Sequence, residues 1–216
     1  MGRKNSAASL AGLVVAALAL TGCSSTSGGE KLADSYSRTR GHLTESQGQV
    51  DETLSALNGL RITNPTNLSN AFSQYKQAVA ELEKKGAEAK ELAAGMKQNM
   101  DANTKKWEKE MESIDDPTVK SSVESRRQAV RSNYDQLKMY AQDARAAYEP
   151  FLKDNQAIVK ALSMNLSPAA VSGLSTSMDR AAADGKTLKE KIAAMQRAMD
   201  NIAKGQSATG AAASAG

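Results

Sequence analysis

Apolar residues recur every three to four positions from Glu30 to Lys204, which is the spacing of one face of an α-helix. A period near 3.5 residues sustained over so many turns is typical of helices that pack as in a coiled coil. No stretch alternates between apolar and polar residues with a period of two, so we predict no β-sheet. The pattern divides into four helical segments, at residues 30–60, 65–114, 117–165 and 168–204.

Prolines mark the starts of three of these segments. Each of the three follows a residue that can cap a helix, in the pairs Asn64-Pro65, Asp116-Pro117 and Ser167-Pro168. Pro150 lies inside the third segment, where we expect a kink rather than an end. The turns after the second and third segments are short, so neighbouring helices should run antiparallel. The expected fold is therefore all-α, an elongated antiparallel four-helix, coiled-coil-like bundle.

Four polar or small residues interrupt the apolar stripes. Asn103 and Asn155 occupy stripe positions, where a buried asparagine commonly fixes the register of two helices. We favour that interpretation over ligand binding. Gly86 and Gly185 also fall in stripes, and they either let helices approach closely or mark bends.

The N-terminus has the parts of an export signal. Arg3 and Lys4 precede an apolar run from Leu10 to Leu20, which is shorter than the roughly 20 residues that span a bilayer. The sequence Leu20-Thr21-Gly22-Cys23 then resembles the lipobox of bacterial lipoproteins. This resemblance implies that residues 1–22 are a signal peptide, that cleavage occurs between Gly22 and Cys23, and that Cys23 carries acyl chains such as palmitate.

The lipobox resemblance also implies a location. In Gram-negative lipoproteins an aspartate after the cysteine usually retains the protein in the inner membrane, so Ser24 favours the outer membrane, on its periplasmic face. Residues 23–29 would form a lipidated, flexible tether. Residues 205–216 are rich in Ala, Gly and Ser, and we predict a disordered tail there.

Composition bears on the partners, the disulfides and the core of the protein. The net charge is +4, and removing Arg3 and Lys4 with the signal peptide leaves +2, so the basic balance gives no argument for a nucleic-acid partner. The chain has one cysteine, and its lipidation would leave no thiol for a disulfide. Aromatic residues make up only 4% of the chain, which indicates a lean, alanine-rich helical core.

Candidate catalytic and metal-binding groups are few. His42 is the one histidine of the sequence, and we expect its side chain to be exposed. A single histidine and a lipidated cysteine do not make a Cys/His zinc site, and there is no glycine-rich phosphate loop. The methionines in the stripes are interpreted as core filling. We therefore predict no cofactor, no metal and no enzymatic activity.

A basic patch opens the third segment at Arg126, Arg127 and Arg131. It could contact an anionic lipid headgroup, lipopolysaccharide or glycan. The alternative is an ordinary solvated helix face whose arginines pair with Glu124 and Asp135. The residues themselves leave both readings open.

Several motifs resemble an uncharacterised group of bacterial lipoproteins, domain of unknown function 2959, over most of residues 30–204. They are Trp107-Glu108-Lys109-Glu110, Ser125-Arg126-Arg127, Tyr134-Asp135-Gln136-Leu137, Pro150 before Phe151-Leu152-Lys153-Asp154, and Asn165-Leu166. The resemblance implies an envelope lipoprotein rich in coiled coil, and it implies no reaction.

These observations favour a non-enzymatic structural or protein-interaction rod in the cell envelope. Its expected contacts are the membrane, through the lipid on Cys23, and an envelope protein or the cell wall. The alternative is a carrier of a small apolar ligand or lipid, held between helices that part around a cavity.

Overall fold

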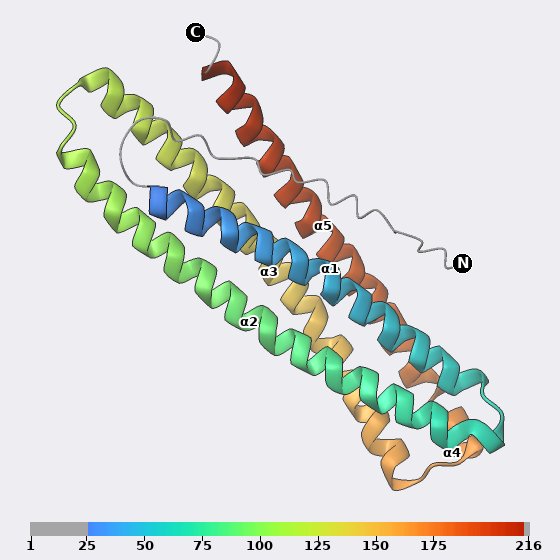
Figure 1. Ribbon diagram of the computed structural model, residues 1–216. Coiled ribbons are helices and arrows are strands. Elements are labelled where there is room, and N and C mark those ends of the chain that lie inside the picture. Colours follow the sequence, from blue (N-terminus) through green and yellow to red (C-terminus); the bar gives the residue numbers. More distant parts are fainter. Residues whose placement is uncertain (1–25, 214–216) are drawn as a thin grey trace, which may run out of the picture.

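The structure is a computed structural model that describes residues 26–213, with side chains placed from Tyr36 to Lys204. Over this range the chain is all-α, with no strand. The elements are α1 (Thr26–Ile62), the 3-10 helix η1 (Pro65–Asn67), α2 (Leu68–Glu112), α3 (Pro117–Met164), α4 (Pro168–Gly173) and α5 (Ser175–Ala213). The long helices lie side by side in a helical bundle that is much longer than it is wide (Figure 1).

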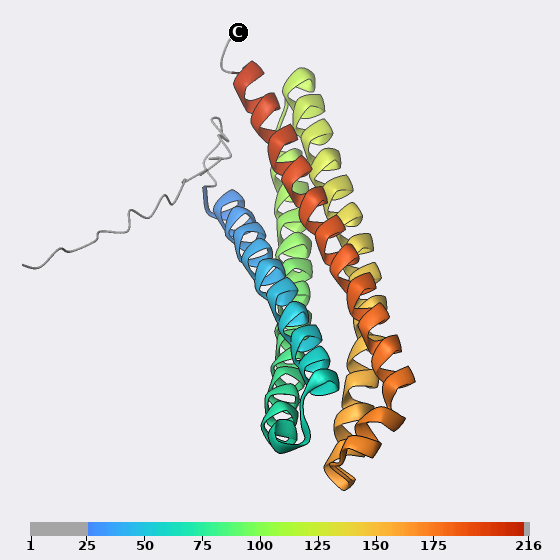
Figure 2. The same cartoon turned by 90° about the vertical axis from the view of Figure 1, so that its right-hand side faces the viewer.

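The long helices associate in two pairs. α1 packs mainly along α2, and α3 packs mainly along α5. Smaller contacts between α1 and α5, and between α2 and α3, join the two pairs (Figure 2). In the described residues no helix is long and apolar enough to cross a bilayer.

The predicted helix starts are confirmed by their caps. The side chains of Asn64, Asp116 and Ser167 each accept a hydrogen bond from a backbone N–H in the turn that follows. These bonds satisfy amide groups that have no partner inside the helix. α3 continues through Pro150, so this proline does not end the helix, as expected.

The fourth segment is not one helix, contrary to the prediction. α4 ends at Gly173, and α5 begins at Ser175 after a tight turn in which the Leu174 N–H donates to the Val171 carbonyl over 3.1 Å. Serine and glycine at this point are weak helix formers. Val171 is buried, so α4 serves to close the bundle where it contacts α1 and α5.

Both ends of the helical region extend further than the pattern indicates. α1 begins at Thr26, within the segment expected to be a flexible tether. α5 continues to Ala213, within the segment expected to be disordered. Alanine is the best helix former, and the alanines after Lys204 favour propagation of α5. The predicted signal peptide and the predicted lipidation site, Gly22 and Cys23 included, lie outside the described residues.

The core consists of two apolar clusters along the bundle. One lies towards the α1–α2 turn and includes Tyr75, Ile158 and Met178, and the other lies in the middle and includes Val50 and Phe151. From Asp101 to Gln136, where α2 and α3 meet at their turn, no side chain is buried. We call residues 101–136 the hairpin end; it lies at the upper left in Figure 1.

The two stripe glycines mark close helix contacts. A Cβ on Gly86 would overlap the ring of Tyr148, which extends from α3. A Cβ on Gly185 would lie 2.8 Å from both Leu54 Cδ2 and Phe151 Cε2. These glycines therefore let side chains of neighbouring helices reach the α2 and α5 backbones, and the interpretation as close-approach positions is confirmed.

Candidate functional site: the groove between α1 and α2

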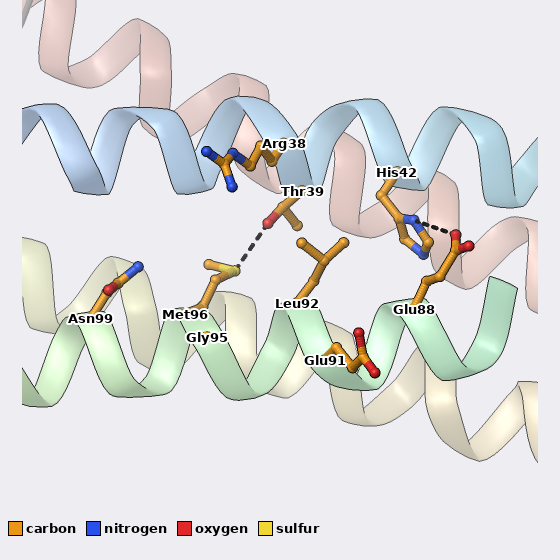
Figure 3. A pocket seen from close by; sticks show the side chains of 9 residues that line it. All are labelled: Arg38, Thr39, His42, Glu88, Glu91, Leu92, Gly95, Met96 and Asn99. Atoms are coloured by element: carbon orange, nitrogen blue, oxygen red, sulfur yellow. Dashed lines mark hydrogen bonds and ion pairs between the residues drawn. The ribbon is translucent and has the colours of Figure 1, made fainter. Parts of the chain in front are cut away.

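A groove with a volume of about 410 Å³ lies between α1 and α2, lined by nine residues (Figure 3). α1 contributes Arg38, Thr39 and His42 to one wall. α2 contributes residues spaced three and four apart from Glu88 to Asn99, which is the spacing of a single helix face. The groove therefore follows from the pairing of two amphipathic helices.

Gly95 explains why the space is open. It lies in the middle of the α2 face that lines the groove, and a Cβ at this position would meet nothing within 4 Å. A larger residue at this point of a helix pair would usually fill the interface with its side chain. The missing side chain leaves a gap beside Leu92 and Met96 (Figure 3).

His42 lies between α1 and α2 beside Glu88 (Figure 3), and the prediction that it is exposed is wrong. Its side chain is only 10% exposed, because α2 covers it. The Nδ1 atom is 3.8 Å from a carboxylate oxygen of Glu88. The Nε2 atom is buried and has no hydrogen-bond partner in the described part of the chain.

Charged side chains surround His42 on the Glu88 side. Lys85 is 3.0 Å from the Glu88 carboxylate and 2.8 Å from that of Glu45 on α1. The hydrogen bond to Lys85 holds the pKa of both carboxyl groups below the usual range of glutamic acid. The two carboxylates in turn raise the pKa of Lys85. This network ties α1 to α2 beside the groove and keeps its charges in place.

The groove has a polar end on each side of an apolar floor. Glu88 and Glu91 lie at the His42 end, and Asn99 lies at the other (Figure 3). Between them the Thr39 hydroxyl donates to Met96 Sδ over 3.2 Å.

The structure places the predicted basic patch on the hairpin end. Arg127 is 3.0 Å from Glu124 and 3.8 Å from Glu108 on α2, and its hydrogen bond lowers the pKa of Glu124. Arg126 and Arg131 are exposed, and neither forms an ion pair with another described residue. The role of this basic patch as a contact for an anionic partner remains a prediction.

A second groove, of about 310 Å³, lies between α3 and α5 around Pro150. Its lining includes Asp143, Asp184 and Lys191, and Lys191 is 3.1 Å from Asp143. Within the described part of the chain, no group of three or more His, Cys, Asp or Glu residues is placed to hold a metal ion.

Sequence reasoning missed the α1–α2 groove. His42 and Gly95 were both visible in the sequence, but 53 positions separate them and neither is part of a motif. The pairing of α1 with α2 brings them to one groove.

Comparisons with known proteins agree with the motif resemblance. A family model described as "Protein of unknown function (DUF2959)" matches residues 26–204. No curated protein and no solved structure matches the chain.

Proposed function

Because this chain belongs to the DUF2959 family of proteins of unknown function, we propose its role from its own residues. It is a non-enzymatic lipoprotein, held by the lipid on Cys23 in the outer membrane, facing the periplasm. There it acts as a structural or protein-interaction rod of the cell envelope, with the form of an elongated antiparallel four-helix, coiled-coil-like bundle.

The observation that carries the proposal is the short distance in sequence between the lipobox and the first helix. Cys23 precedes the start of α1 at Thr26 by only three residues. The 37 residues of α1 correspond to roughly 55 Å of helix at 1.5 Å per residue. A lipid at Cys23 would therefore continue almost directly into a long helix, which suits a rod that extends from a membrane.

The packing of the core supports the rod over the alternative, a carrier of an apolar ligand. Phe151, Ile158 and Met178 have no exposed surface, and they fill the space between the helices. A carrier would need the helices to part around an apolar cavity, at the cost of these contacts. The rod requires no such rearrangement.

The hairpin end is the proposed contact surface for an envelope partner. It carries the exposed Arg126 and Arg131, and none of its side chains is buried. Residues that are not committed to the core are free to contact another molecule without unfolding the bundle.

The anchor is tested by metabolic labelling with a palmitate analogue. We expect Cys23→Ser to lose the label and to leave the membrane fraction, since two or more acyl chains are needed for stable anchoring. The matched control is Ser24→Ala, which keeps the cysteine and should keep both label and location. Undiminished label in Cys23→Ser would overturn the anchor.

The interaction role is tested by cross-linking in cells. A photo-reactive residue at Arg131 should capture an envelope protein or cell-wall component. The same residue at Met139, which is 61% exposed elsewhere on α3, is the control for non-specific capture. Recovery of the free monomer alone from both positions would contradict the rod as an interaction protein.

A further inference from the structure

One end of the bundle carries no charged residue at its turns. Residues 62–75 and 161–178 contain no Asp, Glu, Lys, Arg or His, although charged residues make up 24% of the chain. These two stretches form the turn between α1 and α2 and the turns between α3 and α5, with η1 and α4. Both lie at the same end of the bundle, at the lower right in Figure 1 and at the bottom in Figure 2. We call residues 62–75 and 161–178 the uncharged end.

The uncharged end exposes large apolar side chains. Ile62 and Met164 are each 76% exposed, more than any other large apolar side chain placed in the structure, and Leu166 is 37% exposed. Ile62 is the last residue of α1 and Met164 the last of α3, and Leu166 lies in the turn that follows α3. Exposed apolar side chains gathered at one place mark a contact with another surface, and uncharged neighbours lower the cost of removing that place from water.

The charged residues that border the uncharged end leave a positive balance. They are Arg61, Lys76, Lys160 and Asp179. Arg61 and Asp179 neutralise one another across α1 and α5, with 2.7 Å between Nη1 and the carboxylate. Lys76 and Lys160 are exposed, and neither forms an ion pair with another described residue. Two unpaired ammonium groups therefore lie beside the exposed apolar side chains.

This combination fits an anionic bilayer surface better than a second copy of the chain. The apolar side chains can enter the boundary between headgroups and acyl chains, while the two lysines extend to the anionic headgroups. A second copy docked through the same end would bring the same two lysines to the contact, and like charges repel. Lipids without net charge would give the lysines no counter-charge.

We propose that the uncharged end binds the surface of an anionic lipid bilayer, with Ile62, Met164 and Leu166 at the headgroup boundary and Lys76 and Lys160 on the headgroups. The contact uses no residue of the proposed lipid anchor and does not depend on it. If Cys23 also carries acyl chains, the two membrane contacts lie at opposite ends of α1, which is roughly 55 Å long. The rod would then be attached to bilayer surfaces at both ends.

The test is co-sedimentation of the mature chain with lipid vesicles. The chain carries Cys23→Ser, so that it has no acyl chain and keeps every described residue. The probes are vesicles of phosphatidylglycerol, which is anionic, and of phosphatidylcholine, which has no net charge. We expect half of the protein to be bound at about 1 mM phosphatidylglycerol or less, and binding to phosphatidylcholine about ten-fold weaker or more. Sodium chloride at about 0.5 M should weaken the binding to phosphatidylglycerol, because salt screens the charges.

The apolar contact is tested by Ile62→Ser and Met164→Ser. Both side chains are exposed and lie outside the core, so the thermal unfolding midpoint should stay unchanged. Each variant should weaken vesicle binding about ten-fold or more, the effect of keeping one large apolar side chain in water. Met139→Ser, at a side chain that is 61% exposed in the middle of α3, is the matched control and should leave binding unchanged.

The charge contact is tested by Lys76→Gln/Lys160→Gln. This double variant should bind phosphatidylglycerol vesicles about ten-fold more weakly or more, and its weak binding to phosphatidylcholine should not change. Lys120→Gln/Lys138→Gln removes two exposed lysines of α3 outside the uncharged end. It is the control and should bind both kinds of vesicle as the unaltered chain does.

Three results would overturn the proposal. They are no sedimentation with phosphatidylglycerol vesicles at about 5 mM lipid, equal binding to both lipids, and unchanged binding in Ile62→Ser/Met164→Ser. A dimer in sedimentation velocity that is lost in Ile62→Ser, without vesicle binding, would also overturn it and assign this end to a second copy. None of these results affects palmitate labelling at Cys23, so failure of this contact is distinguishable from failure of the anchor.

Discussion

The Tyr75 hydroxyl of α2 donates a hydrogen bond to Asn155 Oδ1 of α3 over 2.7 Å, and neither residue has any exposed surface. The Asn155 side-chain amide donates in turn to the Phe151 carbonyl of its own helix, also over 2.7 Å. The bond to Phe151 lies within α3, whereas the bond from Tyr75 requires one alignment of α2 against α3. A shift of either helix by a turn would separate the Tyr75 hydroxyl from Asn155 Oδ1 inside the core, so this pair sets the register, the role predicted for a stripe asparagine.

Removing the Tyr75 hydroxyl should therefore destabilise the fold. Tyr75→Phe removes the hydroxyl that donates to the buried Asn155 Oδ1. We expect a loss of about 1–3 kcal/mol in the free energy of unfolding. Urea denaturation followed by circular dichroism measures it. Tyr140→Phe, at a half-buried tyrosine of α3, is the control and should change the free energy of unfolding by less than about 0.5 kcal/mol.

The same pair predicts a non-additive double variant. Asn155→Leu alone removes the 2.7 Å acceptor of the Tyr75 hydroxyl and leaves it only the backbone carbonyl of residue 155, at 3.4 Å. In Tyr75→Phe/Asn155→Leu no polar side-chain group of the pair remains. The double variant should therefore lose less stability than the sum of the two single losses. Strict additivity would show that the two groups do not interact.

Gly185→Ala tests the close approach of α5 to its neighbours. The new Cβ would lie 2.8 Å from Leu54 Cδ2 and from the buried Phe151 ring, so we expect a loss of about 1–3 kcal/mol from overpacking. Gly59→Ala adds the same methyl group where nothing lies within 4 Å. It should raise the free energy of unfolding by up to about 1 kcal/mol through helix propensity. If both variants behave alike in urea denaturation, the packing at Gly185 is looser than described.

Alkaline pH should destabilise the protein through one buried and two partly buried tyrosines. Burial raises the pKa of Tyr36 and Tyr148 from 10.0 to about 12, and it also raises that of Tyr75. Because the folded-state pKa is higher, the contribution to stability is complete below pH 10 and is lost as the pH rises from 10 through 12. The free energy of unfolding, measured across this pH range, should fall as the pH rises. In Tyr148→Phe it should fall by less than in the unaltered protein, because one of the titrating groups is absent. A free energy of unfolding that stays constant up to pH 12 would contradict these shifts.

The hairpin end should open more readily than the rest of the bundle. None of its side chains is buried, and the Asp116 carboxylate holds the start of α3 through hydrogen bonds of 2.8 and 3.1 Å to two backbone N–H groups. Hydrogen exchange should therefore be faster at residues 101–136 than at residues 137–164. Asp116→Ala should speed it further, by a loss of about 0.5–2 kcal/mol in local stability, with little change in residues 137–164.

Uniform protection along α3 would contradict this picture. Asp115→Ala is the matched control, because Asp115 is the neighbouring exposed aspartate and makes none of the capping bonds. It should leave the exchange rates of the hairpin end near those of the unaltered protein.

Much of the fold could be predicted because it depends on local rules. The helix starts after Asn64, Asp116 and Ser167 depend on a cap and a proline, which act within one turn. The stripe positions of Val50, Phe151 and many others are buried as expected, because helical period alone decides which residues share a face. The break at Leu174 was missed, since a helical pattern continues on both sides of it.

The site could not be predicted, because it depends on which helices pair and how each is rotated. His42 lies beside the stripe residue Leu43, and the expectation of exposure assumed a narrow buried face. The broad contact of α1 with α2 covers His42 as well. Gly95 becomes an opening only because it meets this part of α1.

By itself the sequence determined that the chain is helical, where three of its helices begin and which residues share the apolar face of a helix, because each of these depends on neighbours within a few residues. Which part of that face is buried was decided by the packing, since no side chain of residues 101–136 is buried. It also supplies the lipobox resemblance at Cys23. Only the tertiary structure decided that Tyr75 meets Asn155, that Gly86 and Gly185 admit neighbouring side chains, and that α2 covers His42 beside Glu88. These contacts join residues far apart in the chain, and they follow from the packing of whole helices.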